Sequence, residues 1–433
     1  MVVAIDVKRD EEESEGVVVV IREYDPATDR DGADAVDREC ELCPAGGMSL
    51  HADLLGDPVA RIRHSPAFLM LVRVHHLALH GRRIVCANAT FGGGGGIIAP
   101  VAETSGPGGR IVGVIRGTVK EVATGKSSSG SDSASASVGY ILGLRVVPSH
   151  RRMGIALRLV QQMELWFEGK GAQYAYMATE TSNEASLRLF TDRCGYSKFR
   201  TPSLLVHPVH SHRLRSPRRA TVVRLDAADA ALLYRSRFAN VEFFPADIDD
   251  VLANPLSRGT FLAIVDDEWR GVEQFLTSPP ASWAVASAWD CGGVFRLELR
   301  GASRLRRGAA AATRALDRAA KWLRVPSVPD LFRPFAGWFV YGLGGGGGDA
   351  ALAAEALFAS VVNMARGRAA VVAVEVAACD PLRRRIPHWR RLSCAEDLWC
   401  MKRLGGGGDG HADGWDWSRS APGNAIFVDP REV

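Results

Sequence analysis

The stretch that decides the fold is "PSHRRMGIALRLV", which runs from Pro148 to Val160. It follows an apolar, β-branched run and leads into residues with apolar side chains at helical spacing, so it predicts a strand, a turn and a helix. N–H groups at a helix N-terminus lack an intrahelical partner, and the helix dipole makes that end positive. Gly154 lets the backbone approach an anion closely, and Arg151 and Arg152 add charge and hydrogen-bond donors. The stretch therefore predicts a turn that holds a pyrophosphate group.

The neighbouring sequence has to support this interpretation, because Arg-x-x-Gly-x-Ala alone is more often a plain helix start with two solvated arginines. The helix after Arg151 is expected to end near Gly169. Beyond it, "AQYAYMATE" predicts a strand, "SNEASLRLFTDRC" a short helix capped at Ser182 or Asn183, and "LLVHPV" a strand. Before the turn, β-branched runs predict strands at 17–24, 67–72, 110–122 and 138–147. This order predicts an α+β (mixed α/β) fold in which helices flank a central mixed sheet.

A second unit follows the first and repeats its order of elements in a weak form. The basic stretch "HSHRLRSPRR" predicts a linker between the two units. The apolar residues near the end of the tail predict that the tail docks back on the protein. The expected boundaries are 17–209 for the first domain, 210–219 for the linker, 220–404 for the second domain and 405–433 for a glycine-rich linker and tail.

Residues 73–100 fit the first domain badly, because they interrupt a strand and end close to a run of five glycines. A long structureless segment inside a compact domain is unusual, so we expect an extraneous insertion there. The histidines His75, His76 and His80 have no carboxylate or thiol beside them that would complete a metal site. The pair Cys40-x-x-Cys43 lacks a second pair of ligands, so no bound metal is expected.

The composition is that of an ordinary globular protein. A length of 433 residues fits two or three domains, and a net charge of +4 gives no reason to expect direct binding of nucleic acid. No run approaches the length of a transmembrane helix, and the N-terminal residues lack the pattern of a secretory signal, so no membrane partner is expected. The scattered cysteines are typical of reduced thiols inside a cell.

Two blocks of the sequence resemble a known enzyme family. The stretch "LGLRVVPSHRRMGIALRLV" resembles motif A of the GCN5-related N-acetyltransferases (GNAT), and "NEASLRLFTDRCGY" resembles the next block of that family. Longer blocks, including "IREYDPATD", "DPLRRRIPHWRRLSCAEDLWCMKRL" and "IFVDPREV", resemble the plant HOOKLESS family of probable N-acetyltransferases across nearly the whole chain. The resemblance implies a GNAT fold followed by a degenerate second GNAT-like domain that shapes the acceptor cleft. It also implies acetyl-CoA as the cosubstrate and no metal.

The resemblance also assigns binding residues. It implies that the backbone N–H near Leu144 faces the thioester carbonyl, and that Arg145 and Val146 run along the pantetheine arm. Asn183 and Phe190 are expected against the pantetheine and the thiol end. The residues expected to hold the pyrophosphate are Arg151, Arg152, Met153, Gly154, Ile155 and Ala156.

The catalytic residues depart from the family pattern. A lysine amine with a pKa of about 10.4 is neutral in only about one molecule in 2,500 at pH 7, so a proton acceptor is useful. Where some relatives have a glutamate base this chain has Tyr140, and where many have a tyrosine acid it has Phe190, which cannot protonate a thiolate. We expect Glu180, at the end of its strand, to be the substitute base, with Tyr140 as a proton relay. A solvated strand-end charge is an equally good interpretation of Glu180.

The resemblance implies an enzyme that acetylates an amine of a protein and acts in plant development. Histone lysines and a nuclear location are suggested by the resemblance alone, with the cytoplasm as the alternative location. Two alternatives stay open: an acetyltransferase for small-molecule amines, and a regulatory scaffold that binds acetyl-CoA with weak turnover.

Overall fold

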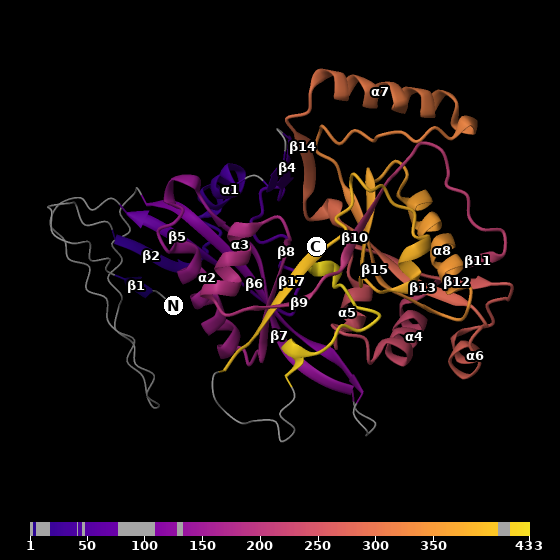
Figure 1. The fold of residues 1–433 in the computed structure, drawn as a ribbon, viewed down its shortest axis with the longest axis horizontal. Coiled ribbons are helices and arrows are strands. Elements are labelled where there is room, and N and C mark those ends of the chain that lie inside the picture. Colours follow the sequence, from indigo (N-terminus) through magenta and orange to yellow (C-terminus); the bar gives the residue numbers. More distant parts are fainter. Residues whose placement is uncertain are drawn as a thin grey trace.

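Two sheet-containing halves lie side by side in the computed structural model (Figure 1). The structure describes residues 3–5, 18–40, 42–45, 48–76, 109–127, 133–405 and 416–433. Most of the segment expected to be an insertion therefore lies outside the described residues. Its first four residues, 73–76, are described, and they do not interrupt the strand as expected. Strand β5 (Ala67–His76) continues through them and pairs with β2 (Val18–Glu23).

The first half is built on an eight-stranded sheet with the order β1-β2-β5-β6-β7-β8-β17-β9. Its strands are antiparallel except for β7 and β8, which are parallel. The remaining strands are β1 (Val3–Ile5), β6 (Arg110–Ser127), β7 (Ser133–Val146), β8 (Tyr174–Glu180), β17 (Asp397–Arg403) and β9 (Ser197–Arg200). Its helices are α1 (Arg30–Glu39), α2 (Ile155–Gly169) and α3 (Glu184–Arg188), the last followed by the π-helical turn Leu189–Arg193.

Helices α1 and α2 cover opposite faces of this sheet. The ring of Phe167 on α2 lies so close to Gly139 that a Cβ added there would be 2.5 Å from it. On the other face, Arg116 of β6 forms a buried ion pair of 2.6 Å with Asp37 of α1. The glycine lets α2 sit directly on the strands, and α2 in turn fixes the turn that precedes it.

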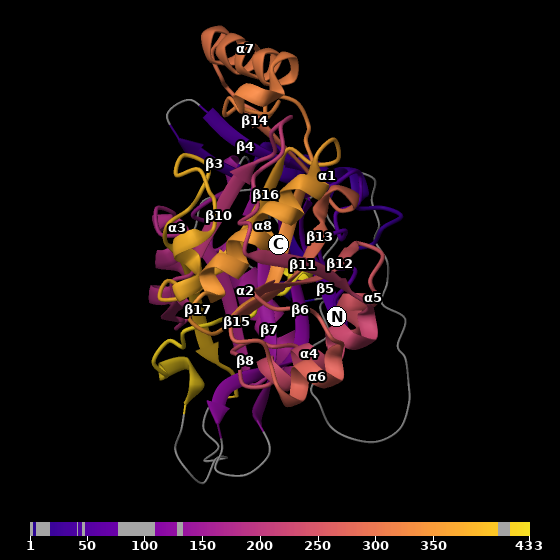
Figure 2. The same ribbon diagram turned by 90° about the vertical axis from the view of Figure 1, so that its right-hand side faces the viewer.

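The second half is built on a six-stranded sheet with the order β10-β16-β15-β13-β12-β11. Helix α8 (Ala350–Ala365) packs on this sheet through buried side chains that include Leu357 and Val361, and Figure 2 shows it lying across the sheet. The strands are β10 (Ser203–Pro208), β16 (Val371–Val376), β15 (Gly337–Gly346), β13 (Trp283–Asp290), β12 (Ser257–Val265) and β11 (Ala220–Leu225). The helices are α4 (Ala227–Phe238), α5 (Ile248–Ala253), α6 (Val272–Thr277) and α7 (Arg304–Ala319), and α7 projects from the rest (Figure 1).

A small third sheet joins the halves, since β14 (Arg296–Arg300) pairs with β4 (Met48–Asp53), and β4 pairs with β3 (Leu42–Ala45). Short 3-10 turns complete the description. They are Pro148–His150, Cys291–Gly293, Lys321–Leu323, Pro381–Arg385, Trp417–Arg419 and Pro430–Glu432.

The two large sheets exchange strands. Strand β10 follows the first half in sequence but pairs with β16 in the second sheet, whereas β17 comes from the far end of the second half and lies between β8 and β9. The domain boundaries expected from the sequence place 203–208 in the first domain and 397–403 in the second. In the structure, each of these two strands pairs within the sheet of the other half. Both strands are short, and the residues of a short strand do not encode which sheet it joins.

The C-terminal tail docks between the halves, as its apolar residues predict. Phe427 is buried at 1% exposure. Lys120 of β6 forms buried ion pairs with Asp429 at 3.2 Å and with Glu432 at 2.9 Å. Arg431 pairs with Asp247 of the second half at 2.6 Å. The tail therefore connects the first sheet to the second half through charged groups that satisfy one another.

Candidate functional site

The segment Arg151–Gly154, here called the α2 turn, stands exposed before helix α2. Arg152 and Gly154 have positive φ values of 64° and 73°, and a Cβ added to Gly154 would meet no atom within 4 Å. No side chain caps the helix. Successive N–H groups in such a turn, together with the N–H groups of the first helical turn, form a concave site for an anion. The α2 turn is thus open to an anion, and binding of a pyrophosphate there stays a prediction.

The residues of the α2 turn have different surroundings. Met153 is 59% exposed, whereas Ile155 is buried and lies under Gly113 of β6. The Nε of Arg151 donates a hydrogen bond of 3.2 Å to the carbonyl of Val146. The thiol of Cys40 donates to that same oxygen at 3.4 Å. Ile155 therefore anchors the turn in the core, while Arg151 connects it to the end of β7.

Strand β7 has a bulge just before this end. Gly143 and Leu144 together stand opposite Ile115 of β6, and Gly143 has a φ of 61°. Arg116 donates to the Gly143 carbonyl at 3.3 Å, so the bulge is held in place from β6. A bulge turns backbone groups out of the ladder, which agrees with the expectation that the Leu144 N–H is offered to a ligand.

Arg145 follows the bulge and is tied to helix α1. It donates to the Asp37 carbonyl at 2.8 Å and to the Cys40 carbonyl at 3.2 Å, and burial lowers its pKa. Only the main chain of Arg145 is left for a ligand, so the expected role in cofactor binding narrows to its backbone.

Strands β7 and β8 separate at the same level as the bulge. Their parallel pairing runs from Val138 and Tyr174 to Ile141 and Met177 and stops there, although β7 continues to Val146. On its other edge β8 stays paired with β17 up to Glu180. The separated segments, 142–146 and 178–180, are here called the β7–β8 opening. Their facing backbone edges can accept an extended chain such as a pantetheine arm.

Aromatic rings line the sheet beside this opening, on the face opposite α2. The ring of Tyr140 lies 4.7 Å from that of Tyr176, which stacks at 5.5 Å on Trp399 of β17. The Tyr176 hydroxyl donates to Glu432 at 2.5 Å. Burial and the neighbouring Glu432 raise the pKa of Tyr140, so its phenol keeps its proton at neutral pH.

Glu180 ends β8 at an exposed position. Ser182 donates to its carboxylate at 3.2 Å, and in the register of the sheet it faces Asp397 on β17. Burial raises the pKa of Asp397 to about 6, and the charge of Glu180 adds to this rise. The structure therefore brings Glu180 to one edge of the opening.

The other two residues expected to contact the coenzyme, Asn183 and Phe190, make contacts within the protein. Asn183 caps α3 by accepting from the Ser186 N–H at 3.2 Å, and it donates to Thr179 at 3.1 Å. Phe190 is 1% exposed, with its ring edge-to-face at 5.1 Å on Tyr196. The cap at Asn183 agrees with the sequence prediction. The side chain of Phe190 packs in the core and has almost no exposed surface to offer a ligand.

One carboxylate near the opening was missed by the sequence analysis. Glu375 lies on β16 of the second sheet, and the indole N–H of Trp399 donates to it at 3.1 Å. Burial raises the pKa of Glu375 to about 8, with Asp397 as the next contribution. The available signal was the acidic residue within the otherwise apolar run "VVAVEV", a position where an unpaired charge is costly.

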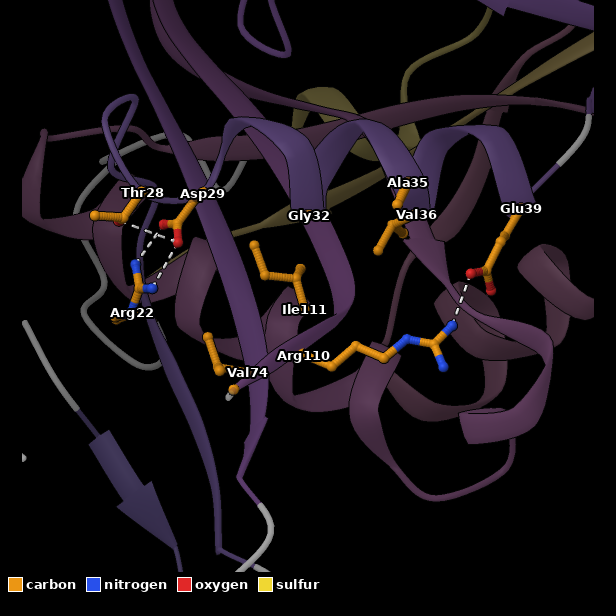
Figure 3. A pocket seen from close by; sticks show the side chains of 11 residues that line it. Arg22, Thr28, Asp29, Gly32, Ala35, Val36, Glu39, Val74, Arg110 and Ile111 are labelled. Atoms are coloured by element: carbon orange, nitrogen blue, oxygen red, sulfur yellow. Dashed lines mark hydrogen bonds and ion pairs between the residues drawn. The ribbon is translucent and has the colours of Figure 1, made fainter. Parts of the chain in front are cut away.

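Another pocket, of about 200 Å³, lies beside α1 and is shown in Figure 3. Arg22 pairs with Asp29 on one side of it, and Arg110 pairs with Glu39 at 2.7 Å on the other. Its lining includes no residue of the α2 turn or of the β7–β8 opening. Its charged groups already satisfy one another, so it does not compete with the opening as a functional site.

Two properties of the described part of the chain bear on the class of site. Within it, no group of three or more His, Cys, Asp and Glu side chains is placed to hold a metal ion. None of the helices that the structure describes is long and apolar enough to cross a membrane.

Comparisons with known proteins show which family this chain is similar to. Residues 88–196, which include β7, the α2 turn, α2 and β8, match the family model described as "Acetyltransferase (GNAT) family". Two proteins of Arabidopsis thaliana are similar over 96% of this chain: "Probable N-acetyltransferase HLS1-like" at 47% identity over 99% of its length, and "Probable N-acetyltransferase HLS1" at 48% over 100%. A solved GCN5-related N-acetyltransferase from Sphaerobacter thermophilus matches 90% of this chain and 97% of its own, with 14% identity and a TM-score of 0.45.

Proposed function

Because this chain belongs to the GNAT acetyltransferases, among the relatives of HLS1, we propose that it transfers an acetyl group from acetyl-CoA to a primary amine of a protein. The observation that carries the proposal is the open α2 turn next to the bulged, unpaired edge of β7. A pyrophosphate at the turn and a pantetheine arm along the edge would form one continuous binding path. When bound, acetyl-CoA supplies the activated acyl group.

The chain's own residues would hold the cosubstrate mainly through the backbone. N–H groups of the α2 turn and of the first helical turn, which no side chain caps, would donate to the pyrophosphate, and the guanidinium groups of Arg151 and Arg152 would add positive charge. The open space around Gly154 fits this role, since a side chain there would occupy the place of a phosphate oxygen.

The backbone N–H of Leu144 would stabilise the negative charge that develops on the carbonyl oxygen during attack. A donor fixed by a bulge costs little reorganisation during the reaction. Tyr140, whose phenol stays protonated, would serve as a proton relay toward the departing thiolate, a role that the buried ring of Phe190 cannot take.

A protein acceptor, and histone lysines in particular, is supported by the family resemblance. A nuclear location has the same support, and the basic runs "HRLRSPRR" and 383–385 are compatible with nuclear import. A role in plant development likewise rests on the resemblance. The acceptor and the location are therefore questions for experiment.

The test has two steps. Calorimetry with acetyl-CoA should show one site per chain with binding that requires the α2 turn, and a mass-based screen should show acetylation of lysine-bearing histone tail peptides. Acetylation of small amines but not of peptides would replace the protein acceptor by a metabolite. Binding without transfer to any amine would identify a ligand-binding scaffold, and absence of binding would refute the proposal.

A further inference from the structure

Glu375 reaches the first half of the protein from the second sheet. It lies on β16 opposite Leu204 of β10, in the sheet pairing that the strand exchange creates. The indole N–H of Trp399 donates to its Oε1 at 3.1 Å. Trp399 itself stands on β17 opposite Ala178, the first residue of β8 beyond the pairing with β7. Glu375 is therefore hydrogen-bonded to β17, the strand that pairs with β8 on the edge opposite the β7–β8 opening.

The side from which Glu375 approaches is also defined. Trp399 stacks on Tyr176, and Tyr176 lies beside Tyr140, so these rings share one face of the sheet. Helix α2 covers the other face, where Phe167 lies against Gly139. A cosubstrate held by the α2 turn and an amine that approaches from the second half would thus meet at the opening from opposite sides.

We propose that Glu375 is the catalytic base of this enzyme and accepts a proton from the acceptor amine at the β7–β8 opening. This inference rests on the proposed acetyl transfer. The ammonium group gives one proton to Glu375, which later releases it to water. The amine nitrogen then forms a bond to the acyl carbon as the bond from carbon to sulfur breaks with its electron pair on sulfur. The second proton lost from nitrogen goes to that thiolate, so atoms and charge balance.

The surroundings of Glu375 suit the role of a base. Burial raises the pKa of Glu375 to about 8, and Asp397 on β17 and Glu432 in the tail raise it further, whereas the Trp399 hydrogen bond lowers it. The other titratable neighbours are Tyr140 on β7 and Cys394 before β17, both of which sense the charge of Glu375. A carboxylate with a raised pKa is a stronger base, and removal of a proton from an amine needs one.

The test compares Glu375→Gln with Glu180→Gln in the full chain, using the amine that the wild type acetylates best. Glu375→Gln should lower kcat/KM for the amine by about 100-fold or more, and the acid limb of the pH profile near pH 8 should disappear. Acetyl-CoA affinity, measured by calorimetry, should stay unchanged. Glu180→Gln should keep the acid limb, whatever its effect on the rate.

A spectroscopic measurement tests the same residue without turnover. Trp399 fluorescence, taken as the difference between the wild type and Trp399→Phe, should titrate with a midpoint near pH 8, and Glu375→Gln should abolish that titration. Trp399→Phe removes a hydrogen bond that favours the charged carboxylate, so the acid limb of activity should move to higher pH.

Two outcomes would overturn the inference alone: a Glu375→Gln enzyme within about threefold of the wild-type rate, or one that is slower but keeps the acid limb. The inference would also be overturned if the Trp399 fluorescence difference showed no titration near pH 8. If the wild-type chain transferred acetyl groups to no amine, the proposed function itself would fail, so the two failures are distinguishable.

Discussion

Two arginine-rich helix starts in this protein look alike in sequence but differ in what they leave open. The α2 turn reads "RRMGIA", and the start of α7 reads "SRLRRGAAAA". At α7, Ser303 caps the helix by accepting from the Arg306 N–H at 3.3 Å, and Gly308 lies inside the helix. At α2, the N-cap position is occupied by Gly154, which has a φ of 73°. No side chain there accepts a hydrogen bond from the N–H groups of the first helical turn. The protein therefore satisfies one helix end internally and leaves the other available to an anion.

The supports of the two helices differ as well. Helix α2 packs on β5, β6 and β7 of the first sheet, whereas α7 follows β14 of the small sheet and projects from the rest (Figure 2). A ligand site needs a rigid support. The first turn of α2 lies directly on the sheet, whereas α7 is held near its C-terminal end, where the buried Asp317 accepts from Ser211 and Ser327. The comparison teaches that the position of glycine relative to the cap separates the two segments: Gly154 is itself the cap of α2, whereas Gly308 lies five residues after the cap of α7.

The largest effect is expected from a carboxylate in the α2 turn. Gly154→Asp should weaken acetyl-CoA binding by at least about 100-fold, because it places a negative charge where the pyrophosphate is expected and a side chain at a positive φ. Calorimetry measures the affinity. The matched variant Gly308→Asp in α7 should leave the affinity unchanged. Equal affinities for Gly154→Asp and the wild type would mean that the coenzyme does not use this turn.

A smaller loss is expected when the charges are removed and the backbone is kept. The double variant Arg151→Ala and Arg152→Ala should weaken acetyl-CoA binding by about tenfold or more, since hydrogen bonds from charged groups are worth about 1.5–3 kcal/mol each. Arg306→Ala with Arg307→Ala in α7 serves as the control and should have no effect. If the double variant bound acetyl-CoA as tightly as the wild type at low salt, the two arginine side chains would contribute nothing and the backbone N–H groups alone would hold the ligand.

The packing of the two helices can be compared by stability. Gly139→Ala pushes a methyl group into the ring of Phe167 and should lower the free energy of unfolding by about 1–3 kcal/mol. Gly308→Ala adds a methyl to an exposed helix position with nothing within 4 Å, and should raise that free energy by roughly 0.5–1 kcal/mol. Denaturant unfolding measures both. A neutral Gly139→Ala would show that α2 can move away from β7.

The smallest effect concerns the cap of α7. Ser303→Ala removes the acceptor for the Arg306 N–H and should cost about 1 kcal/mol of local helix stability. Hydrogen exchange should be faster in the first turn of α7, while the first turn of α2 and acetyl-CoA binding stay the same. Faster exchange in α2 as well would mean that the two helix ends are coupled.

The sequence predicted the local parts of the site well. The strand before residue 148, the α2 turn, helix α2 and the Asn183 cap all follow from residue patterns that act over a few positions. The exchange of β10 and β17 was not predictable, because strand pairing over long sequence distances leaves no local pattern. Glu375 was missed for the same reason: it approaches the opening only when β16 is beside β10 and β17 is beside β8. Phe190 was placed near a ligand by resemblance, but it packs in the core.

The strand exchange has a consequence for synthesis of the chain on the ribosome. The edges of β8 and β9 that flank β17 exist once residue 200 has emerged, but β17 ends only at Arg403. At about 5–20 residues per second, translation takes on the order of ten to forty seconds to supply the missing strand. During that interval the nascent first half carries unpaired strand edges, which are templates for aggregation. We expect early engagement by chaperones, and a chain released after residue 209 should fail to give a soluble first domain.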